Sequence, residues 1–265
     1  MTTSAVSAVA AERGAVRLVR DGAVVRLVLD RPPLNVLTIA MLEELHGILG
    51  ELAADDSVKL VALSGNGKAF CAGVDVADHA EDRVTRMLEL FHGALLRLHR
   101  LPCPTVAVAH GAALGGGCEL ILACDLVLAR EDLKVGQPEI RLGVFPPFAA
   151  AILPQLVGRQ RALELVLTGC TLSAVEAHAA GLVTRVYSDI DFDASVQEYL
   201  SQLVRLSGPV QRLAKRAVVE CAFMPLADAV AHAEALYAND LLQLHDAREG
   251  LAAFMEKRAP VWREA

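Results

Sequence analysis

Two glutamates stand beside stretches that restrain the backbone, and they are the residues best suited to acid–base chemistry. Glu119 ends the stretch GGGCE at 115–119, and Glu139 follows Pro138, which is expected to fix a stiff, non-helical backbone. A strand-like segment separates them, so the chain has room to return and place both in one cleft. Two carboxylates in an apolar pocket separate in pKa, which suits one acid and one base. Taken singly, however, Glu139 is more often a solvated loop residue.

The glycine triplet before Glu119 is predicted to lie where a strand meets a helix. A strand pattern ends near His110, and a helical pattern resumes around Gly117. The first N–H groups of a helix lack partners and favour an anion, and glycine lets a ligand approach them closely. The spacing matches no nucleotide-binding loop, so a small developing charge, such as an enolate oxygen, fits better than a diphosphate. Tight helix packing, with Glu119 assisting the helix start, is an equally good explanation.

A second glycine-rich stretch, ALSGNGKAFCAGVDV at 62–76, could supply another backbone donor. Its tight turn at 72–73 would leave the N–H of Val74 free to meet the same oxygen. Two converging N–H groups form an oxyanion hole. The alternative is a plain loop in which Asp75 caps the next helix, and the residues alone favour that alternative.

Hydrophobic patterns predict the strands and helices that would position these residues. Strands are predicted at 23–33, 58–67, 104–111 and 124–132, with amphipathic helices at 38–55 and 81–101. Further along, helices are predicted at 193–206, 209–223 and 226–257. Strands that alternate with helices indicate an α/β fold. We therefore expect an α/β domain over 15–192 and a helical subdomain over 193–265.

Composition excludes several classes of function. A formal net charge of −7 argues against a nucleic-acid-binding protein, and no apolar stretch reaches membrane-spanning length. The six cysteines lack metal-binding or paired spacing, which favours free thiols in the cytoplasm. A hydrophobic fraction of 54% suggests a homo-oligomer with buried interfaces. The first 18 residues resemble a frayed tail more than a signal peptide.

The eight histidines show no spacing typical of a metal site, so metal catalysis is not expected. Three of them, His46, His92 and His99, fall on predicted helices. We expect these three side chains at the surface or at the edge of the core.

Taken together, the linked motifs resemble the crotonase (enoyl-CoA hydratase) superfamily. The stretches that carry the resemblance are 64–76, 109–129, 136–146, 156–187 and 249–260. The resemblance implies a spiral of β-β-α turns with a C-terminal helical region that mediates trimers, often paired into hexamers. It also implies an acyl-CoA thioester as ligand, with coenzyme A as part of the substrate and no separate cofactor.

The resemblance assigns roles residue by residue. The N–H groups of Val74 and Gly116 would hold the thioester oxygen. Glu119 and Glu139 match the two carboxylates of the hydratases, and keeping both favours adding or removing water across a conjugated C=C bond. Glu119 would take a proton from water, and Glu139 would deliver one to the α-carbon. Five further positions would contact substrate: Ala72, Asp75, Phe145, Pro147 and Phe148.

The sequence departs from the hydratase pattern in two places, near the expected water site and near the expected coenzyme A contact. In GVFPPFAA at 143–150, Pro147 replaces a glycine whose N–H lies near the catalytic water in hydratases, and Phe145 and Phe148 add bulk. After Asp75, Ala77 stands near where many relatives carry a lysine that approaches coenzyme A. The combined motifs are most similar to the cyclohexa-1,5-diene-1-carbonyl-CoA hydratase subgroup. Double-bond isomerisation, thioester hydrolysis and non-catalytic acyl-CoA binding remain alternatives.

Overall fold

The computed structural model describes residues 10–11 and 14–264 and divides the chain into two compact units. The first unit runs to Leu101 and continues over Thr105–Gln197, and the second combines Pro102–Pro104 with the chain from Glu198 onward. The expected N-terminal tail falls mostly outside the described residues.

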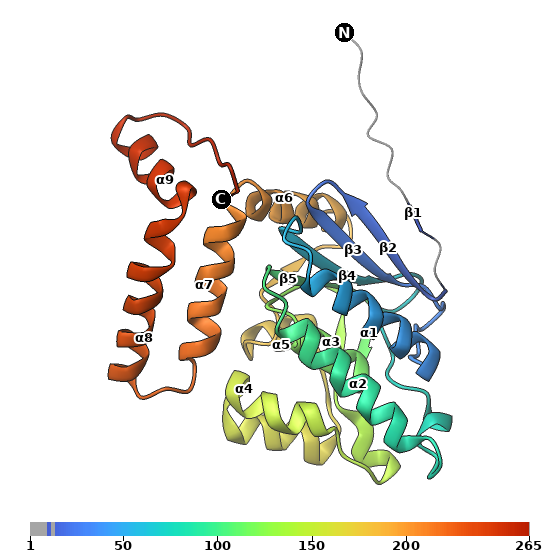
Figure 1. Cartoon of the computed structure of the whole chain (residues 1–265). Coiled ribbons are helices and arrows are strands. Elements are labelled where there is room, and N and C mark those ends of the chain that lie inside the picture. Colours follow the sequence, from blue (N-terminus) through green and yellow to red (C-terminus); the bar gives the residue numbers. More distant parts are fainter. Residues whose placement is uncertain (1–9, 12–13, 265) are drawn as a thin grey trace. The chain divides into compact units, whose positions relative to one another are not determined.

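The first unit is built on a mixed sheet of seven strands in the order β1-β2-β3-β4-β5-β7-β10 (Figure 1). These strands are β1 (Ala10–Ala11), β2 (Val16–Asp21), β3 (Val24–Leu29), β4 (Leu60–Gly65), β5 (Thr105–Ala109), β7 (Leu126–Arg130) and β10 (Arg185–Tyr187). Pairing is antiparallel from β1 to β3 and parallel from β3 to β10. The four predicted strands correspond to β3, β4, β5 and β7, and β4 and β5 are largely buried.

A second, three-stranded sheet lies beside the glycine triplet. It consists of β6 (Ala112–Leu114), β8 (Lys134–Gly136) and β9 (Thr171–Ser173). Each strand has three residues. Strand β6 is followed directly by the triplet, and β8 leads into the segment that carries Glu139. This small sheet therefore brings the two glutamate-bearing segments side by side.

Two long helices of the first unit pack against each other and match the predicted apolar stripes. They are α1 (Ile39–Ala53), whose first turn is capped by the Thr38 hydroxyl, and α2 (Val84–His99). A short 3₁₀ helix, η1 (Val76–His79), precedes α2. The buried side chains of α2 follow the helical repeat, as expected for an amphipathic helix.

Four more helices of the first unit lie between β6 and β10 along the chain. They are α3 (Gly116–Leu122), the 3₁₀ helix η2 (Pro138–Leu142), α4 (Pro147–Thr168) and α5 (Ala174–Ala179). The expected non-helical backbone at Pro138 is wrong, because a 3₁₀ turn begins at this residue. Proline is tolerated at a first helical position, where its missing N–H has no intrahelical partner to lose. Helix α4 is broken at Gly158, where φ is 75° and ψ is 161°.

The second unit is helical, as predicted. It contains the end of α6 (Phe192–Val204), then α7 (Gly208–Cys221), α8 (Leu226–Asn239), η3 (Leu241–Gln243) and α9 (His245–Met255). The predicted boundary at 192/193 lies five residues before the observed one at Gln197/Glu198. The first turns of α6 belong to the first unit because Phe192 and Val196 are buried and Gln197 accepts a hydrogen bond from Arg26 of β3 at 2.6 Å.

The single helix predicted over 226–257 is wrong, since α8 and α9 are separate. Leu244 takes an extended conformation between them, with φ of −66° and ψ of 136°. The buried carboxylate of Asp246, in the first turn of α9, accepts hydrogen bonds from Ser207 Oγ and from the N–H groups of Arg263 and Glu264. These bonds fix where the new helix begins.

Candidate active site

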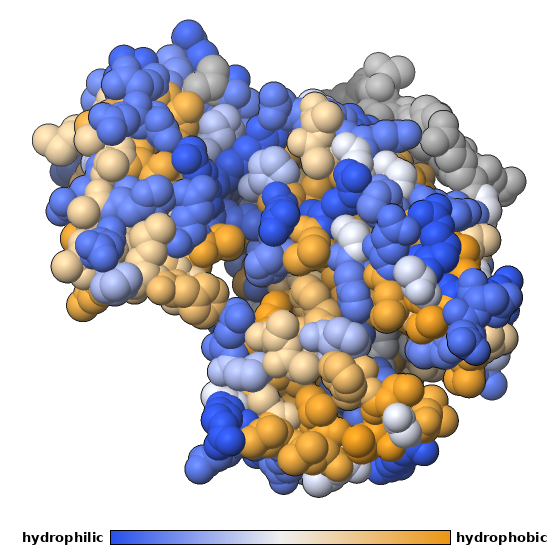
Figure 2. All heavy atoms as spheres, turned by 60° about the horizontal axis from the view of Figure 1, so that its bottom comes forward, coloured by the Kyte–Doolittle hydropathy of each residue, from blue (hydrophilic) through white to orange (hydrophobic). Residues whose placement is uncertain are grey.

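A cavity of about 460 Å³ in the first unit holds both predicted glutamates. Its walls come from the loop around residue 73, one face of α2, the start of α3, η2 and the segment that enters α4. Large exposed apolar side chains also occur in η2, in the segment that follows it and in α4, and they include Leu142, Phe145, Leu163 and Leu167. Figure 2, which turns the bottom of Figure 1 forward, shows apolar side chains gathered on that side.

Seven of the nine predicted site residues line this cavity: Ala72, Val74, Gly116, Glu119, Glu139, Phe145 and Pro147. Asp75 and Phe148 are not among its lining residues. The Asp75 carboxylate instead accepts the N–H of Ala77 at 3.1 Å and caps η1, as the structural alternative for this residue proposed. Phe148 contributes its backbone N–H to Glu119. Substrate contact by these two side chains stays a prediction.

Neighbouring atoms lie so close to the two outer positions of the triplet that only glycine fits there. Gly115 has φ of 55°, and a Cβ there would lie 2.6 Å from Glu139 Oε1. A Cβ at Gly117 would lie 2.0 Å from the carbonyl oxygen of Cys71. Because real Cβ atoms do not come this close, only glycine lets the Glu139 carboxylate and the 71–74 loop reach the start of α3.

The central glycine faces the cavity. A Cβ at Gly116 would lie 2.8 Å from Val74 Cγ2 and 3.0 Å from Phe91 Cζ. A Cβ at Gly73 would lie 3.8 Å from the Gly116 nitrogen, so the two glycine-rich loops are in contact. The tight packing considered as one explanation of the triplet is therefore present, and the same packing brings Val74 beside Gly116.

Val74 and Gly116, the two predicted backbone donors, both line the cavity. Hydrogen bonds of 2.9 Å from Leu37 N–H to Gly73 and of 2.8 Å from Asp75 N–H to Leu37 fix the backbone on both sides of Val74. Within the described residues, neither the Val74 nor the Gly116 N–H donates to a backbone carbonyl. Gly116 is the first residue of α3, so its N–H carries the positive end of the helix dipole. This pair has the composition of an oxyanion hole.

Glu119 is almost fully buried, with 3% of its surface exposed. Its Oε1 accepts the Ala149 N–H at 2.8 Å. Burial raises the pKa of Glu119 to about 8, and the charge of Glu139 adds to the increase, while the N–H groups of Ala149 and Phe148 oppose it. The Glu119 side chain therefore holds a proton at neutral pH.

Glu139 is only half-buried and has different neighbours. Burial raises its pKa, and a backbone N–H and the charge of His79 oppose the increase. The buried Gln137 amide satisfies its hydrogen bonds when its nitrogen faces Glu139, 3.2 Å from Oε1 and 3.1 Å from Oε2. Donors that meet the carboxylate favour its ionised form.

Pro147 is the first residue of α4, so it occupies a position where its missing N–H costs the helix nothing. The next two residues, Phe148 and Ala149, direct their N–H groups to Glu119. The first turn of α4 thus donates hydrogen bonds to the Glu119 carboxylate. Pro147 itself lines the cavity but has no N–H to donate.

The sequence analysis missed the wall that α2 contributes. It consists of Val84, Met87, Leu88, Phe91 and His92, spaced as one helical face. The apolar repeat identified this face as buried, yet nothing in it distinguishes a cavity wall from solid core. His92 was expected at the surface or core edge, and it is partly buried in this wall. His79 and Gln137 were also missed, although both adjoin motifs that had been singled out.

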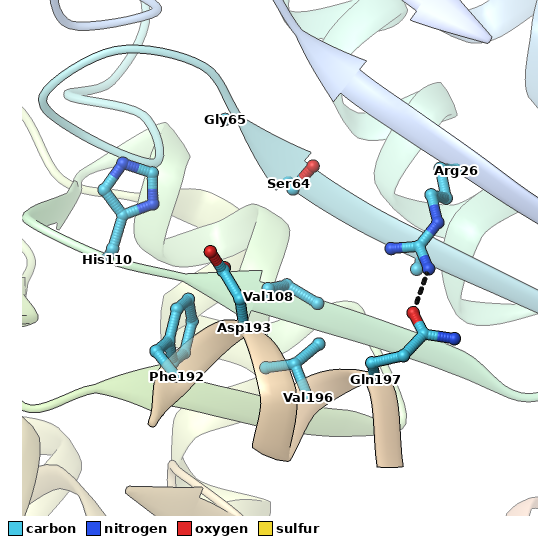
Figure 3. A pocket seen from close by; sticks show the side chains of 10 residues that line it. Arg26, Ser64, Gly65, Val108, His110, Phe192, Asp193, Val196 and Gln197 are labelled. Carbon is cyan, nitrogen blue, oxygen red and sulfur yellow. Dashed lines mark hydrogen bonds between the residues drawn. The ribbon is translucent and has the colours of Figure 1, made fainter. Parts of the chain in front are cut away.

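A second cavity, of about 360 Å³, lies between the sheet and the start of α6 (Figure 3). The Arg26 guanidinium donates to Gln197 at its edge, and His110 Nε2 lies 3.1 Å from the carbonyl oxygen of Gly67. None of the nine predicted site residues lines it. His110 therefore ties the glycine-rich turn in place rather than contributing to the glutamate pair.

Residues 10–11 and 14–264 contain neither a metal-binding cluster nor a membrane-spanning helix. No three histidine, cysteine, aspartate or glutamate side chains there are grouped to hold a metal ion. No helix within that part of the chain combines the length and the apolar character needed to cross a membrane.

The chain is similar to known proteins over most of its length. The family described as enoyl-CoA hydratase/isomerase matches residues 20–265. The chain is 37% identical over 246 residues to the cyclohexa-1,5-dienecarbonyl-CoA hydratase of Thauera aromatica, covering 92% of this chain and 95% of the relative.

Two crystal structures of enoyl-CoA hydratases confirm the predicted crotonase-type α/β fold. The enzyme from Bacillus anthracis superimposes with a TM-score of 0.89 at 32% identity, covering 95% of this chain and 100% of that one. The enzyme from Mycobacterium smegmatis gives 0.90 at 33% identity, covering 94% and 99%. The chain therefore belongs to the enoyl-CoA hydratase/isomerase family.

Proposed function

We propose that this protein is an enoyl-CoA hydratase, which adds water to, or removes it from, a C=C bond conjugated to a coenzyme A thioester. The observation that carries the proposal is the meeting of Glu119 and Glu139 in one cavity with the N–H groups of Val74 and Gly116. Hydration needs a stabilised enolate and two proton transfers, and these four groups can supply both.

The two N–H groups polarise the thioester. When its carbonyl oxygen accepts hydrogen bonds from Val74 and Gly116, the conjugated β-carbon becomes electrophilic. As water attacks, negative charge moves to the carbonyl oxygen, where the two donors and the dipole of α3 stabilise it. These donors are held by the backbone before substrate arrives, so little reorganisation is needed during the reaction.

The two carboxylates exchange the protons. In dehydration, protonated Glu119 donates its proton to the leaving hydroxyl, and ionised Glu139 removes a proton from the α-carbon. Hydration reverses both transfers: ionised Glu119 accepts a proton from the attacking water, and protonated Glu139 delivers one to the α-carbon. The reaction therefore needs one proton on the pair, and burial favours its residence on Glu119 before substrate binds.

An apolar acyl group of moderate size fits the cavity. Its walls include the apolar side chains of Val74, Met87, Phe91, Val144 and Phe145. A cyclic dienoyl-CoA is a suitable candidate, because a flat ring can pack against these side chains. The likeness to the Thauera aromatica hydratase supports the same substrate class.

We also propose that the protein is a homo-oligomer, a trimer or a pair of trimers, in the cytoplasm. The second unit exposes large apolar side chains that an isolated chain would leave in water, including Phe223 at 73%, Leu226 at 80% and Phe254 at 81%. The cytoplasm suits six cysteines that are all free thiols.

The direct test is product mass after incubation with crotonyl-CoA and with cyclohexa-1,5-diene-1-carbonyl-CoA. A gain of one water with loss of conjugated absorbance supports hydration. Absence of turnover of both compounds, and of branched enoyl-CoAs, would overturn the proposal.

Isomerisation or thioester hydrolysis is the second candidate, favoured by the missing N–H at Pro147, which lines the cavity where hydratases carry a glycine. Product mass separates them, because isomerisation leaves the mass unchanged and hydrolysis releases free coenzyme A. Tight acyl-CoA binding without turnover would indicate a non-catalytic binding subunit.

A further inference from the structure

A fully buried asparagine lies outside the cavity, in the segment between β3 and α1. Asn35 is 0% exposed, and it is not among the residues that line the cavity. Its backbone takes the left-handed conformation, with φ of 52°, which asparagine adopts more readily than most residues do. The proposed chemistry does not use this side chain, so its burial needs another reason.

The Asn35 amide is hydrogen-bonded at both ends. Its Oδ1 accepts the N–H of Arg31 at 2.9 Å. Its Nδ2 lies close to three carbonyl oxygens of one loop, those of Asn66 (2.7 Å), Ala69 (2.9 Å) and Phe70 (3.1 Å). Among the backbone hydrogen bonds of residues 10–11 and 14–264, none ends on these three oxygens. One side chain therefore supplies the donor for this part of the loop.

The space around the amide fits asparagine closely. A Cβ at Gly65, the last residue of β4, would lie 2.7 Å from Asn35 Nδ2 and 2.2 Å from the carbonyl oxygen of Phe70. Because real Cβ atoms do not come this close, glycine at position 65 lets the amide and the loop meet. The amide is thus packed against the end of a strand as well as bonded to the loop.

The residues next to Asn35 continue the same contact as far as the Val74 donor. The carbonyl of Leu34 accepts the N–H of Ala72 at 2.9 Å. Two residues after Asn35, Leu37 pairs with Val74 as neighbouring parallel strands do. The segment that holds Asn35 therefore runs beside the loop from its glycine-rich turn to the proposed oxyanion donor.

The loop is also bonded to the segment that leads to the other donor, Gly116. The N–H of Phe70 donates to the carbonyl of His110 at 2.9 Å, and that of Cys71 donates to Ala112 at 3.0 Å. The loop over 66–75 is thus tied both to the Asn35 segment and to the chain that enters α3. Its position determines the spacing between the two donors.

We infer that Asn35 is a positioning residue for the oxyanion hole, whose amide holds the 66–75 loop where the Val74 N–H can act together with that of Gly116. The inference rests on the proposed hydratase function and deepens it. Donors that are in place before charge develops stabilise it better than donors that must first reorganise. Loss of the Asn35 amide should therefore weaken binding of the transition state more than binding of the substrate.

The first test is the rate of Asn35→Gly, because glycine keeps the left-handed backbone and removes the amide. The substrate is crotonyl-CoA or cyclohexa-1,5-diene-1-carbonyl-CoA, whichever the wild type hydrates faster. We expect kcat to fall roughly 10- to 100-fold while KM stays within about threefold of wild type. The matched control is Asn66→Gly in the same loop, whose exposed amide donates to Asp30 at 2.6 Å. It should leave kcat close to the wild-type value.

The second test measures the hydrogen bonds to the thioester oxygen directly. Butyryl-CoA with a ¹³C label at the thioester carbonyl has no C=C bond to hydrate, and its C=O stretching frequency falls when donors meet the oxygen. The fall on binding to wild type should be smaller in Asn35→Gly and unchanged in Asn66→Gly. Asn35→Asp, similar in size but without a donor when ionised, should also show the smaller fall. An asparagine that only stabilised the fold would lower the melting temperature without changing this frequency.

Three results would overturn the inference while wild-type hydration leaves the proposed function intact. One is a folded Asn35→Gly or Asn35→Asp variant with wild-type kcat and a wild-type carbonyl frequency. Another is a loss of activity that comes from KM alone. The third is failure of both variants to fold, because Asn35 would then support the whole first unit rather than one donor. Absence of both hydration and a carbonyl shift in the wild type would refute the proposed function, and this inference with it.

Discussion

The two carboxylates of the cavity are the same residue type in contrasting surroundings. Glu119 belongs to α3, is almost completely buried and receives its hydrogen bonds from the first turn of α4. Glu139 belongs to a short 3₁₀ helix, is half exposed and lies near Gln137 and His79. Burial raises both pKa values, that of Glu119 to about 8.

This difference shows how one fold prepares an acid and a base from identical side chains. Depth of burial determines which group keeps the shared proton, and the N–H donors beside each carboxylate oppose the effect of burial. The two carboxylates also receive their hydrogen bonds from different groups, Glu119 from the start of α4 and Glu139 from the Gln137 amide. Changes to α4 and to Gln137 should therefore change the pKa values of the two glutamates in different ways.

The largest effect is expected from removing either carboxylate. Glu119→Gln and Glu139→Gln should each lower kcat by about 10²–10⁴-fold, because each removes one proton transfer. Rates with an enoyl-CoA substrate check this, with Glu164→Gln, a surface glutamate paired with Arg161, as the control. A variant that keeps full activity would show that its glutamate takes no part, as isomerisation with a single carboxylate would allow.

Gly116→Ala should come next, with kcat lowered by about 10²–10³-fold. The new Cβ would lie 2.8 Å from Val74 Cγ2 and would push the two oxyanion donors apart. The pH dependence of the remaining activity should match the wild type, since both carboxylates are retained. Gly47→Ala is the matched control, because a Cβ there meets nothing within 4 Å. Unchanged kcat in Gly116→Ala would argue against the oxyanion hole.

The proton on Glu119 should also make the free energy of unfolding depend on pH. Its folded-state pKa of about 8 lies above the unfolded value near 4.5, so the stability gained by holding the proton is complete below pH 4.5 and is lost as pH rises through 8. Glu119→Gln cannot ionise, so it should gain about 4 kcal/mol in free energy of unfolding relative to wild type between pH 5 and pH 9. Thermal melting at both pH values tests this, and equal differences would show that Glu119 ionises normally.

Gln137→Leu should give the smallest change, roughly a tenfold loss of kcat/KM near neutral pH. Without the amide donor, ionised Glu139 is less stable, so the acidic limb of the pH–rate profile should move to higher pH. Gln155→Leu, on the exposed side of α4, serves as the control and should leave the profile in place. A profile that moves equally in both variants would contradict the role of Gln137.

Much of the site was predictable because its parts lie in short, linked motifs. The glycine triplet, the Val74 loop and both glutamates are local patterns with chemical reasons behind their spacing. The four hydrophobic strand segments were predictable for a similar reason, since strands covered on both faces are continuously apolar.

The features that escaped prediction depend on contacts between distant segments. Strands β6, β8 and β9 have three residues each, and their pairing with one another, rather than their composition, makes them strands. The orientation of α2 that places His92 in the wall of the cavity likewise cannot be predicted from the hydrophobic repeat of α2 alone. The break between α8 and α9 depends on Asp246, whose partners, such as Arg263, come later in the chain.

Helix α4 couples the shape of the cavity to the acidity of Glu119. The segment that lines the cavity at Val144, Phe145 and Pro147 runs straight into the turn whose Ala149 N–H meets the carboxylate. We expect a ligand that pushes this segment outward to draw that N–H away and so to raise the pKa of Glu119. A well-fitting ligand leaves the hydrogen bond from Ala149 to Glu119 intact. A poorly fitting substrate would therefore meet a Glu119 side chain that ionises less readily, in addition to making poorer contacts.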